Sequence, residues 1–289
     1  MRSSLRKLGL GAAQLPSALS VRGRAPDAEL RDMLVAAQRA GLGFLDAGAA
    51  SGRVEQVLGE VLPRPEGFQI LVRSVRGDRG PDVAEAEARA TLGRLGLQTA
   101  RAVVVQSASD LFAPSGEALW TRLKALRDQG LFEQVGVCAY ASDDPAGLAR
   151  RFKPDLIQAP ASLLDQRLLV DGSLMAVRDM GVEVHLRSIF LNGLLFLPPD
   201  RVPAQLKGAA GRLSRARRMI AEGRSDPLQA ALGFALSRPE ADAVIVGASS
   251  ASELSAVIAA ASSPPPDLDW DEMAIDDPVA LDPRRWAAA

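Results

Sequence analysis

The sequence predicts an α/β fold, a closed parallel (β/α)8 barrel of the TIM type. Short apolar segments of strand character alternate with amphipathic segments of helical spacing along the chain. Eight strand–helix units fit into about 260 of the 289 residues, which is the usual size of such a barrel. A doubly wound open sheet is the alternative fold. It is disfavoured because no GxGxxG motif follows the first strand segment.

The expected strands are short and β-rich, and they occupy residues 8–11, 43–46, 69–75, 102–106, 134–138, 156–158, 182–186 and 243–247. Between them lie patterns such as PDAELRDMLVAAQRAG, DVAEAEARATLGRLG and SGEALWTRLKALRDQG, which carry apolar residues at helical spacing and end on glycine. Pro26 before Asp27 and Asp226 before Pro227 indicate two helix starts.

The domain prediction is a single barrel over residues 1–263, since no linker divides the chain. Composition changes at the three prolines 264–266, which precede the acidic stretch DLDWDEMAIDD and the ending DPRRWAAA. We interpret residues 264–289 as a C-terminal tail that lies over the barrel or frays. A long loop, 197–213, leads into a helix that carries Arg212, Arg215, Arg217 and Arg218.

Composition excludes several classes of protein. A hydrophobic content of 47% is typical of a globular chain, and a net charge of −1 gives no support to nucleic-acid binding. The single cysteine, Cys138, excludes a disulfide framework and a structural zinc site, so no metal is expected. No apolar run reaches the roughly 20 residues that cross a bilayer, and MRSSLRKLGLGAAQLP lacks a signal-peptide core. We therefore expect a cytoplasmic protein without membrane insertion.

An ordered set of segments carries a resemblance to a known family. The segments are KLGLGAAQLP, AGLGFLDAGAASGRVEQVLGEVL, GLFEQVGVCAY, FKPDLIQAPASLLDQ, VEVHLRSIFLNGLL and PLQAALGFALSRPEADAVIVGASSASEL. In this order and spacing the chain resembles the aldo-keto reductase family over nearly its whole length. The resemblance implies a barrel of aldo-keto reductase type that binds a nicotinamide dinucleotide across the C-terminal ends of its strands.

The family's catalytic set is an Asp, a Tyr five residues later, a Lys that ends the third strand and a His that ends the fourth. The tyrosine donates a proton as hydride arrives, and the other groups tune it or orient the carbonyl. In this sequence the resemblance gives these places to Asp46, Ser51, Ser74 (with Arg73 beside it) and Gln106. No Tyr, Lys or His lies between residues 8 and 119, so this degenerate set predicts no carbonyl reduction by the family mechanism.

The resemblance implies that this sequence retains more of the family's cofactor-binding residues than of its catalytic residues. Asp46 and Gln158 match residues that meet the nicotinamide ribose and amide, whereas Cys138–Ala139 replaces a Ser-Asn pair. Arg187 stands where the family often has a ring stacked on the nicotinamide, and its charge would favour a pyrophosphate. The groove continues through Ser188, Asn192, Gly193 and the adenosine-phosphate loop 247–254, with Gly247, Ser249, Ser250 and Glu253. Since Glu253 would repel a 2′-phosphate, we expect NAD(H) more than NADP(H).

Other polar residues allow a structural and a functional interpretation. We interpret His185 as a core histidine and Tyr140 as a packing residue that could reach a ligand. Cys138 is interpreted as a small buried apolar residue, with a redox role as the alternative. The arginines of residues 212–218 form a solvated helix face or, alternatively, a partner-binding patch.

Two function classes remain open. One is a divergent reductase that uses Ser51, Arg73 or Gln106 and reduces a small carbonyl substrate with NAD(P)H. The other is a pseudo-enzyme that signals through occupancy of the dinucleotide site. This class is favoured because the sequence retains the cofactor groove but lacks the residues that handle protons in the family. Within the family, the chain is similar to a regulator of bacterial cell division and the cell cycle. That similarity implies NAD(H) binding, recruitment to the division site, and action on the tubulin-like GTPase FtsZ and on a cell-cycle histidine kinase. Its moving parts would be the loop 197–213 and the tail 264–289.

Overall fold

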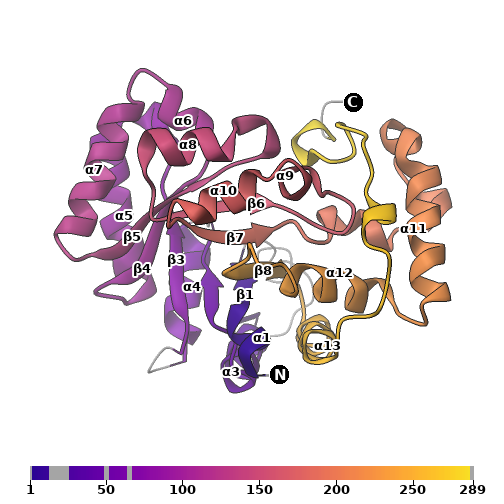
Figure 1. Ribbon diagram of the computed structural model, residues 1–289. Coiled ribbons are helices and arrows are strands. Elements are labelled where there is room, and N and C mark those ends of the chain that lie inside the picture. Colours follow the sequence, from indigo (N-terminus) through magenta and orange to yellow (C-terminus); the bar gives the residue numbers. More distant parts are fainter. Residues whose placement is uncertain (1, 13–25, 49–51, 64–66, 287–289) are drawn as a thin grey trace.

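The computed structural model describes residues 2–12, 26–48, 52–63 and 67–286, and its strands form a closed parallel barrel in the order β1 to β8 (Figure 1). This confirms the predicted (β/α)8 barrel. The strands are β1 (Leu8–Gly11), β2 (Phe44–Asp46), β3 (Gln69–Arg73), β4 (Ala100–Val105), β5 (Phe132–Cys138), β6 (Leu156–Pro160), β7 (Glu183–Arg187) and β8 (Ala243–Gly247). The barrel closes between β1 and β8, where Leu10 pairs with Val246.

The predicted strands agree with the observed ones to within two residues at most ends. β1 and β8 have the predicted bounds, whereas β3 ends at Arg73 rather than at residue 75. β6 is two residues longer than predicted and reaches Pro160, whereas β7 has the predicted length but lies one residue later, at Glu183–Arg187.

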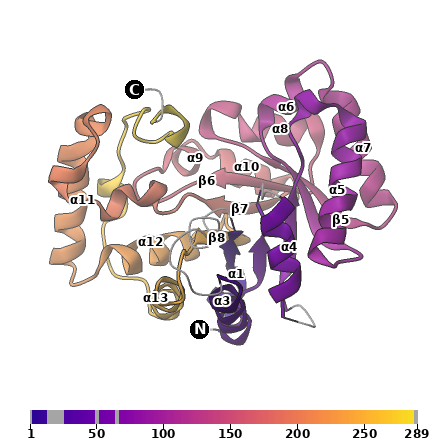
Figure 2. The same cartoon turned by 180° about the vertical axis from the view of Figure 1, so that it is seen from behind.

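Helices surround the barrel, as the front and rear views show (Figures 1 and 2). The α-helices are α1 (Arg2–Lys7), α3 (Pro26–Ala40), α4 (Gly52–Val61), α5 (Pro81–Leu95), α6 (Ala108–Phe112), α7 (Gly116–Asp128), α8 (Pro145–Phe152), α9 (Arg167–Val170), α10 (Ser173–Asp179), α11 (Ala210–Glu222), α12 (Pro227–Leu236) and α13 (Ala251–Ser262). The predicted starts at Pro26 and Pro227 are confirmed. At Pro227 the Asp226 carboxylate accepts hydrogen bonds from the N–H groups of Leu228 and Gln229.

Short 3-10 helices lie in the connections: η2 (Gly77–Arg79), η3 (Ala141–Asp143), η4 (Leu191–Phe196), η5 (Pro199–Arg201), η6 (Ala204–Ala209), η7 (Asp271–Met273) and η8 (Pro283–Arg285). Among the described residues, no helix is long and apolar enough to cross a membrane, and no group of three or more His, Cys, Asp or Glu could hold a metal ion.

Residues alternate between the barrel interior and the surrounding helices along each strand. One buried cluster fills the interior and contains Phe44, Leu71, Ala102, Val104, Cys138, Leu156, Ala243 and Ile245. The intervening strand residues belong to the cluster that packs under the helices. Gly9 is required in β1, because a Cβ atom there would lie 2.5 Å from Ile245 and 2.8 Å from Phe44. This alternation decides which side chains at the C-terminal strand ends can meet inside the barrel.

A polar network closes the N-terminal end of the barrel. His185 is fully buried, its Nε2 lies 2.8 Å from Oε1 of Glu183, and its ring packs edge-on against Phe44. The amide of Gln134 and the guanidinium of Arg101 donate to Oε2 of Glu183, at 2.8 and 3.0 Å. Burial alone would raise the pKa of Glu183, but these partners and His185 lower it to about 2. The buried position confirms the interpretation of His185 as a core residue.

The C-terminal segment, residues 264–286, packs against the side of the barrel beside α11 (Figure 1). Met273, Ile275, Ala280 and Leu281 are buried in a second hydrophobic cluster with residues of α11 and α12. Of the two sequence alternatives for this part of the tail, lying over the barrel is therefore the correct one.

The arginines of α11 are not all free: two pair with the C-terminal segment, one turns inward, and Arg218 is exposed. Arg212 and Arg215 form ion pairs with Asp276 and Glu272 of the C-terminal segment. Arg217 turns inward, and its Nε and Nη2 donate to the carbonyls of Leu195 and Leu194 at 3.1 and 3.0 Å. The acidic stretch after Pro266 thus has a partner within the chain, which the sequence pattern alone did not reveal.

Candidate functional site

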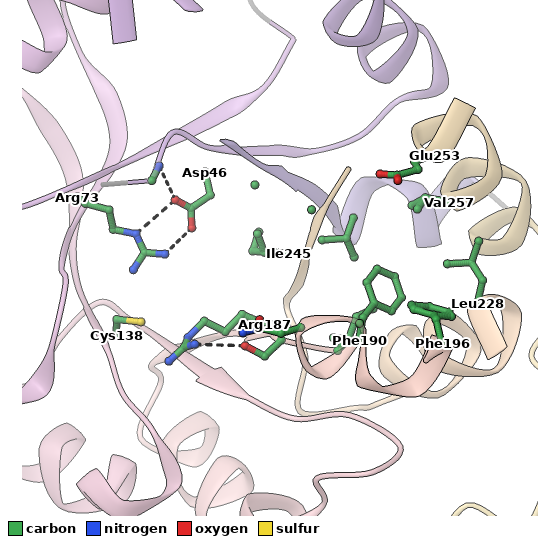
Figure 3. A pocket seen from close by; sticks show the side chains of 18 of the residues that line it. Asp46, Arg73, Cys138, Arg187, Phe190, Phe196, Leu228, Ile245, Glu253 and Val257 are labelled. Carbon is green, nitrogen blue, oxygen red and sulfur yellow. Dashed lines mark hydrogen bonds and ion pairs between the residues drawn. The ribbon is translucent and has the colours of Figure 1, made fainter. Parts of the chain in front are cut away.

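A cavity of about 920 Å³ opens at the C-terminal ends of the strands, where barrel active sites lie. Figure 3 shows Asp46, Arg73, Cys138 and Arg187 at one end, called here the polar end, and Phe190, Phe196, Leu228, Val257 and Glu253 at the other, called the apolar end. Of the residues predicted for the groove or the catalytic set, those that line the cavity are Asp46, Gln106, Cys138, Arg187, Ser188, Asn192, Gly193, Gly247 and Glu253. The phenylalanines, Leu228 and Val257 were not predicted, because apolar residues in loops and helices look like ordinary core.

The polar end is built on a buried ion pair. Oδ2 of Asp46 accepts hydrogen bonds from Nη2 of Arg73 at 2.6 Å and from Nε2 of Gln158 at 2.9 Å. Oδ1 accepts from Nε of Arg73 at 3.3 Å and from the N–H of Gly48 at 3.0 Å. Arg73 also donates to Oε1 of Gln158. Gln158 is fully buried and lies behind this pair rather than on the cavity wall.

This arrangement fixes the charges at the polar end. Burial alone would raise the pKa of Asp46, but the charge of Arg73 and the hydrogen bonds from Arg73 and Gln158 hold it below its ordinary value. Burial would lower the pKa of Arg73, but Asp46 and the neighbouring Cys138 raise it above its ordinary value. Neither group of the pair exchanges its proton near neutral pH.

The structure corrects one position in the sequence comparison. Ser74 was placed at the family's lysine, but the side chain that contacts Asp46 is that of Arg73. Arg73 follows the interior residue Leu71 by two positions, whereas Ser74 follows Val72, which packs under the helices. Ser74 is buried, and its hydroxyl has no hydrogen-bond partner among the described residues. Ser51, at the tyrosine place, lies outside the described residues.

Arg187 lies on the wall of the polar end, where it contacts Tyr140. Its guanidinium carbon is 4.2 Å from the centre of the Tyr140 ring, and Nη2 donates to the carbonyl of Ala139 at 3.1 Å. Nη1 lies 3.3 Å from the hydroxyl of Ser188. Nε is buried and has no partner in the described parts of the chain. Tyr140, interpreted from the sequence mainly as packing, lines the cavity.

The loop after β7 borders the middle of the cavity with an unusual backbone. Ser188, Leu191, Asn192 and Gly193 all have positive φ, at 58°, 47°, 49° and 84°. Residues other than glycine rarely adopt this left-handed backbone conformation. The loop therefore needs contacts from other segments to keep its shape. Arg217 supplies some of these contacts through the carbonyls of Leu194 and Leu195.

The start of α13 is occupied by a carboxylate of the chain itself. The hydroxyl of Ser250 accepts from the N–H of Glu253 at 3.2 Å and caps the helix. Oε2 of Glu253 accepts from the N–H and the hydroxyl of Ser249 at 2.7 and 2.9 Å. Glu253 and Gly247 line the cavity, while Ser249 and Ser250 do not. The negative charge of Glu253 thus takes the backbone donor that an added phosphate would need.

Comparison with known proteins agrees with this geometry. The sequence model described as "Aldo/keto reductase family" matches residues 7–275, and no curated protein matches the chain. An aldo-keto reductase of Bacillus halodurans in its holo form superposes with a TM-score of 0.72 at 19% identity, over 90% of this chain and 87% of the other. A glycerol dehydrogenase of Gluconobacter oxydans gives 0.70 at 16% identity, with 92% and 88% covered. A protein of Pseudomonas aeruginosa described as a putative aldo-keto reductase gives 0.65 at 20% identity, with 89% of each chain covered.

Proposed function

Because the chain belongs to the aldo-keto reductase family, whose members use a nicotinamide dinucleotide, we propose that its cavity binds such a dinucleotide without reducing carbonyl substrates. The residues fit the ligand. The apolar end offers Phe190, Leu228 and Val257 to a base, and the polar end offers hydrogen-bonding groups. The buried, unpartnered Nε of Arg187 marks a remaining donor on the wall. When bound, the dinucleotide would supply hydride chemistry.

The observation that carries the proposal is Ser51 at the place of the family's acid tyrosine, together with an Arg73–Asp46 pair that cannot replace that tyrosine as proton donor. An acid catalyst must release a proton at the moment of hydride transfer, and its pKa must lie near the working pH. Arg73 holds its proton too tightly for this role, and Asp46 stays ionised beside it. With Ser51 at the tyrosine place, the proton-handling set of the family is missing, whereas the groove is kept.

The experiment is a titration of the purified protein with NADH, followed by nucleotide fluorescence or calorimetry. Wild type should bind, and Asp46→Ala should weaken binding by about 1–3 kcal/mol, the cost of a lost buried hydrogen bond. Asp200→Ala serves as control, because Asp200 is exposed and does not line the cavity. Absence of NADH binding by wild type would contradict the proposal.

The preferred dinucleotide is NAD(H). Glu253 holds the N–H of Ser249, two residues before α13, and places a negative charge on the cavity wall. A 2′-phosphate at this position would meet a like charge, whereas the ribose hydroxyls of NAD(H) could donate to the same carboxylate.

The output of binding is regulation of cell division in the bacterial cytoplasm. The chain resembles the bacterial cell-division regulator KidO in its missing catalytic tyrosine, its Arg187-Ser188-x-Phe190-Leu191 segment and its alanine ending. Its partners by this resemblance are FtsZ and a cell-cycle histidine kinase. FtsZ polymers should be sedimented with wild type and with Asp46→Ala, each with and without NADH. Equal co-sedimentation in all four samples would contradict signalling by the nucleotide.

A divergent reductase remains the second candidate, and one observation favours it. The Arg73–Asp46 pair keeps a cation beside the aspartate, as the lysine of the family's catalytic set would. A small carbonyl substrate could then be polarised by this fixed charge. Sustained oxidation of NADH or NADPH with a simple aldehyde would select this candidate.

A further inference from the structure

The C-terminal segment touches the wall of the cavity from outside. Nε and Nη2 of Arg284 donate to the two carboxylate oxygens of Asp282, each at 2.8 Å, and Nη2 lies 3.2 Å from the hydroxyl of Ser142. The guanidinium carbon of Arg284 lies 3.6 Å from the centre of the Tyr140 ring. Tyr140 is the only tyrosine of the chain, and it lines the cavity, whereas Arg284 does not.

The same ring carries a second guanidinium, that of Arg187 on the cavity wall. Arg284, Tyr140 and Arg187 therefore form a continuous line from the C-terminal segment to the polar end. The positive charges of Arg284 and Arg187 are balanced to different degrees. The charge of Arg284 is balanced by bidentate contact with Asp282, while Arg187 contacts a carbonyl and a hydroxyl. Arg187 thus keeps a positive charge available to a ligand.

The C-terminal segment, at the Arg284 end of this line, is held to the barrel by contacts outside the cavity. Arg167 binds Asp165 through two hydrogen bonds of 2.8 and 2.9 Å and donates to the carbonyl of Leu281 at 3.3 Å. The indole of Trp286 donates to the carbonyl of Val279 at 2.9 Å. Leu281 is buried in the second hydrophobic cluster. The segment can therefore act as a fixed support for the Tyr140 ring.

We propose that Arg284 is a positioning residue of the cavity, which acts through Tyr140 to hold Arg187 against a bound dinucleotide. A guanidinium stacked on one aromatic ring loses rotamer freedom before the ligand arrives, so less entropy is lost on binding. The coupling is reciprocal, so a dinucleotide that fixes Arg187 also stabilises docking of residues 282–286. This inference rests on the proposed dinucleotide binding.

The test is NADH affinity for Arg284→Gln, Tyr140→Leu and the double variant, with Arg285→Gln as matched control. Arg285 is the neighbouring arginine, exposed and 3.8 Å from Asp282. Arg284→Gln should weaken NADH binding by about two- to fivefold, the range of an exposed cation–π contact. Arg285→Gln should leave it unchanged. In the Tyr140→Leu background, Arg284→Gln should have no further effect, because the contact that transmits it is gone.

Hydrogen exchange supplies a readout that a purely structural role would not move. NADH should slow exchange of the backbone amides of residues 282–286 in wild type but not in Tyr140→Leu. Unchanged NADH affinity in Arg284→Gln, or an equal loss in both backgrounds, would overturn the inference while leaving the proposed function intact. A wild type that does not bind NADH at all would overturn both.

Discussion

Inside the barrel, Arg73 donates two hydrogen bonds to Asp46, from Nη2 to Oδ2 at 2.6 Å and from Nε to Oδ1 at 3.3 Å. Their side chains are 12% and 4% exposed, so water screens this pair little. The pair sets both the stability of the polar end and the chemistry that this end can perform.

Removal of the arginine charge should destabilise the protein strongly. Arg73→Met keeps much of the side-chain volume but leaves the Asp46 carboxylate buried without its cation. The free energy of unfolding in urea should fall by about 3–5 kcal/mol, as for other broken buried pairs. Arg76→Met is the control, because Arg76 and Asp78 form an exposed pair at 3.6 Å. An exposed pair contributes about 0–1 kcal/mol, so equal losses in the two variants would contradict this account.

The network at the closed end of the barrel should make stability depend on pH. The pKa of Glu183 is lowered to about 2, below its unfolded value of about 4.3. Its contribution is therefore fully present above the unfolded value and is lost as the pH falls through about 2. Urea unfolding at neutral pH should show that Glu183→Gln is less stable by an amount on the order of 3 kcal/mol.

The difference between wild type and Glu183→Gln should shrink as the pH is lowered from about 5 toward 2. Glu133→Gln provides the comparison, because Glu133 also pairs with Arg101 but is 67% exposed. A gap between wild type and Glu183→Gln that stays constant with pH would mean that titration of Glu183 does not stabilise the fold.

Reversing the charge at the start of α13 should change the preferred dinucleotide. Glu253→Lys removes the carboxylate that occupies Ser249 and adds a cation at the cavity wall. NADPH affinity relative to NADH should rise roughly 10- to 100-fold, as expected for one charge-assisted hydrogen bond. Glu222→Lys makes the same charge change on the exposed end of α11. If both variants shift the ratio equally, the effect comes from net charge and not from the site.

Arg217 should stabilise the loop that follows β7 and lines the cavity. Arg217→Met leaves the carbonyls of Leu194 and Leu195 without their donor, and the free energy of unfolding should fall by about 1–3 kcal/mol. NADH binding should weaken as well, since Asn192, Gly193 and Phe196 of the same loop line the cavity. Arg218→Met, at an exposed neighbouring position, should change neither quantity. Unaltered NADH affinity in Arg217→Met would show that the loop holds its shape without this support.

Much of the fold was predictable from the sequence, because strand and helix periods are local properties. The barrel order follows from the alternation of strands and helices, and β1 and β8 have the predicted bounds. Asp46 was predicted for the site from the resemblance to the aldo-keto reductase family, and it lines the cavity. Ser74 rather than Arg73 was assigned to the lysine place of the family's catalytic set. Side chains of a strand alternate with a period of two residues, and counting from the interior residue Leu71 would have selected Arg73.

What escaped prediction depends on contacts between segments far apart in the sequence. Nothing near Arg212 indicates that Asp276 is its partner, and nothing near Tyr140 indicates that Arg284 will lie on its ring. The place of Glu253 on the N–H of Ser249 requires the three-dimensional start of α13. Long-range pairing of this kind is set by tertiary packing, which a pattern of residue types does not encode locally.

The decisive experiment on carbonyl reduction mixes the NADH complex of the protein with aldehydes and follows the absorbance of the bound NADH. We expect the protein to bind NADH and the nucleotide to stay reduced, because Ser51 stands in place of the acid tyrosine and neither Arg73 nor Asp46 can deliver the proton that carbonyl reduction needs. Oxidation of the bound NADH at a rate above that of free NADH, and lost in Asp46→Ala, would contradict this expectation.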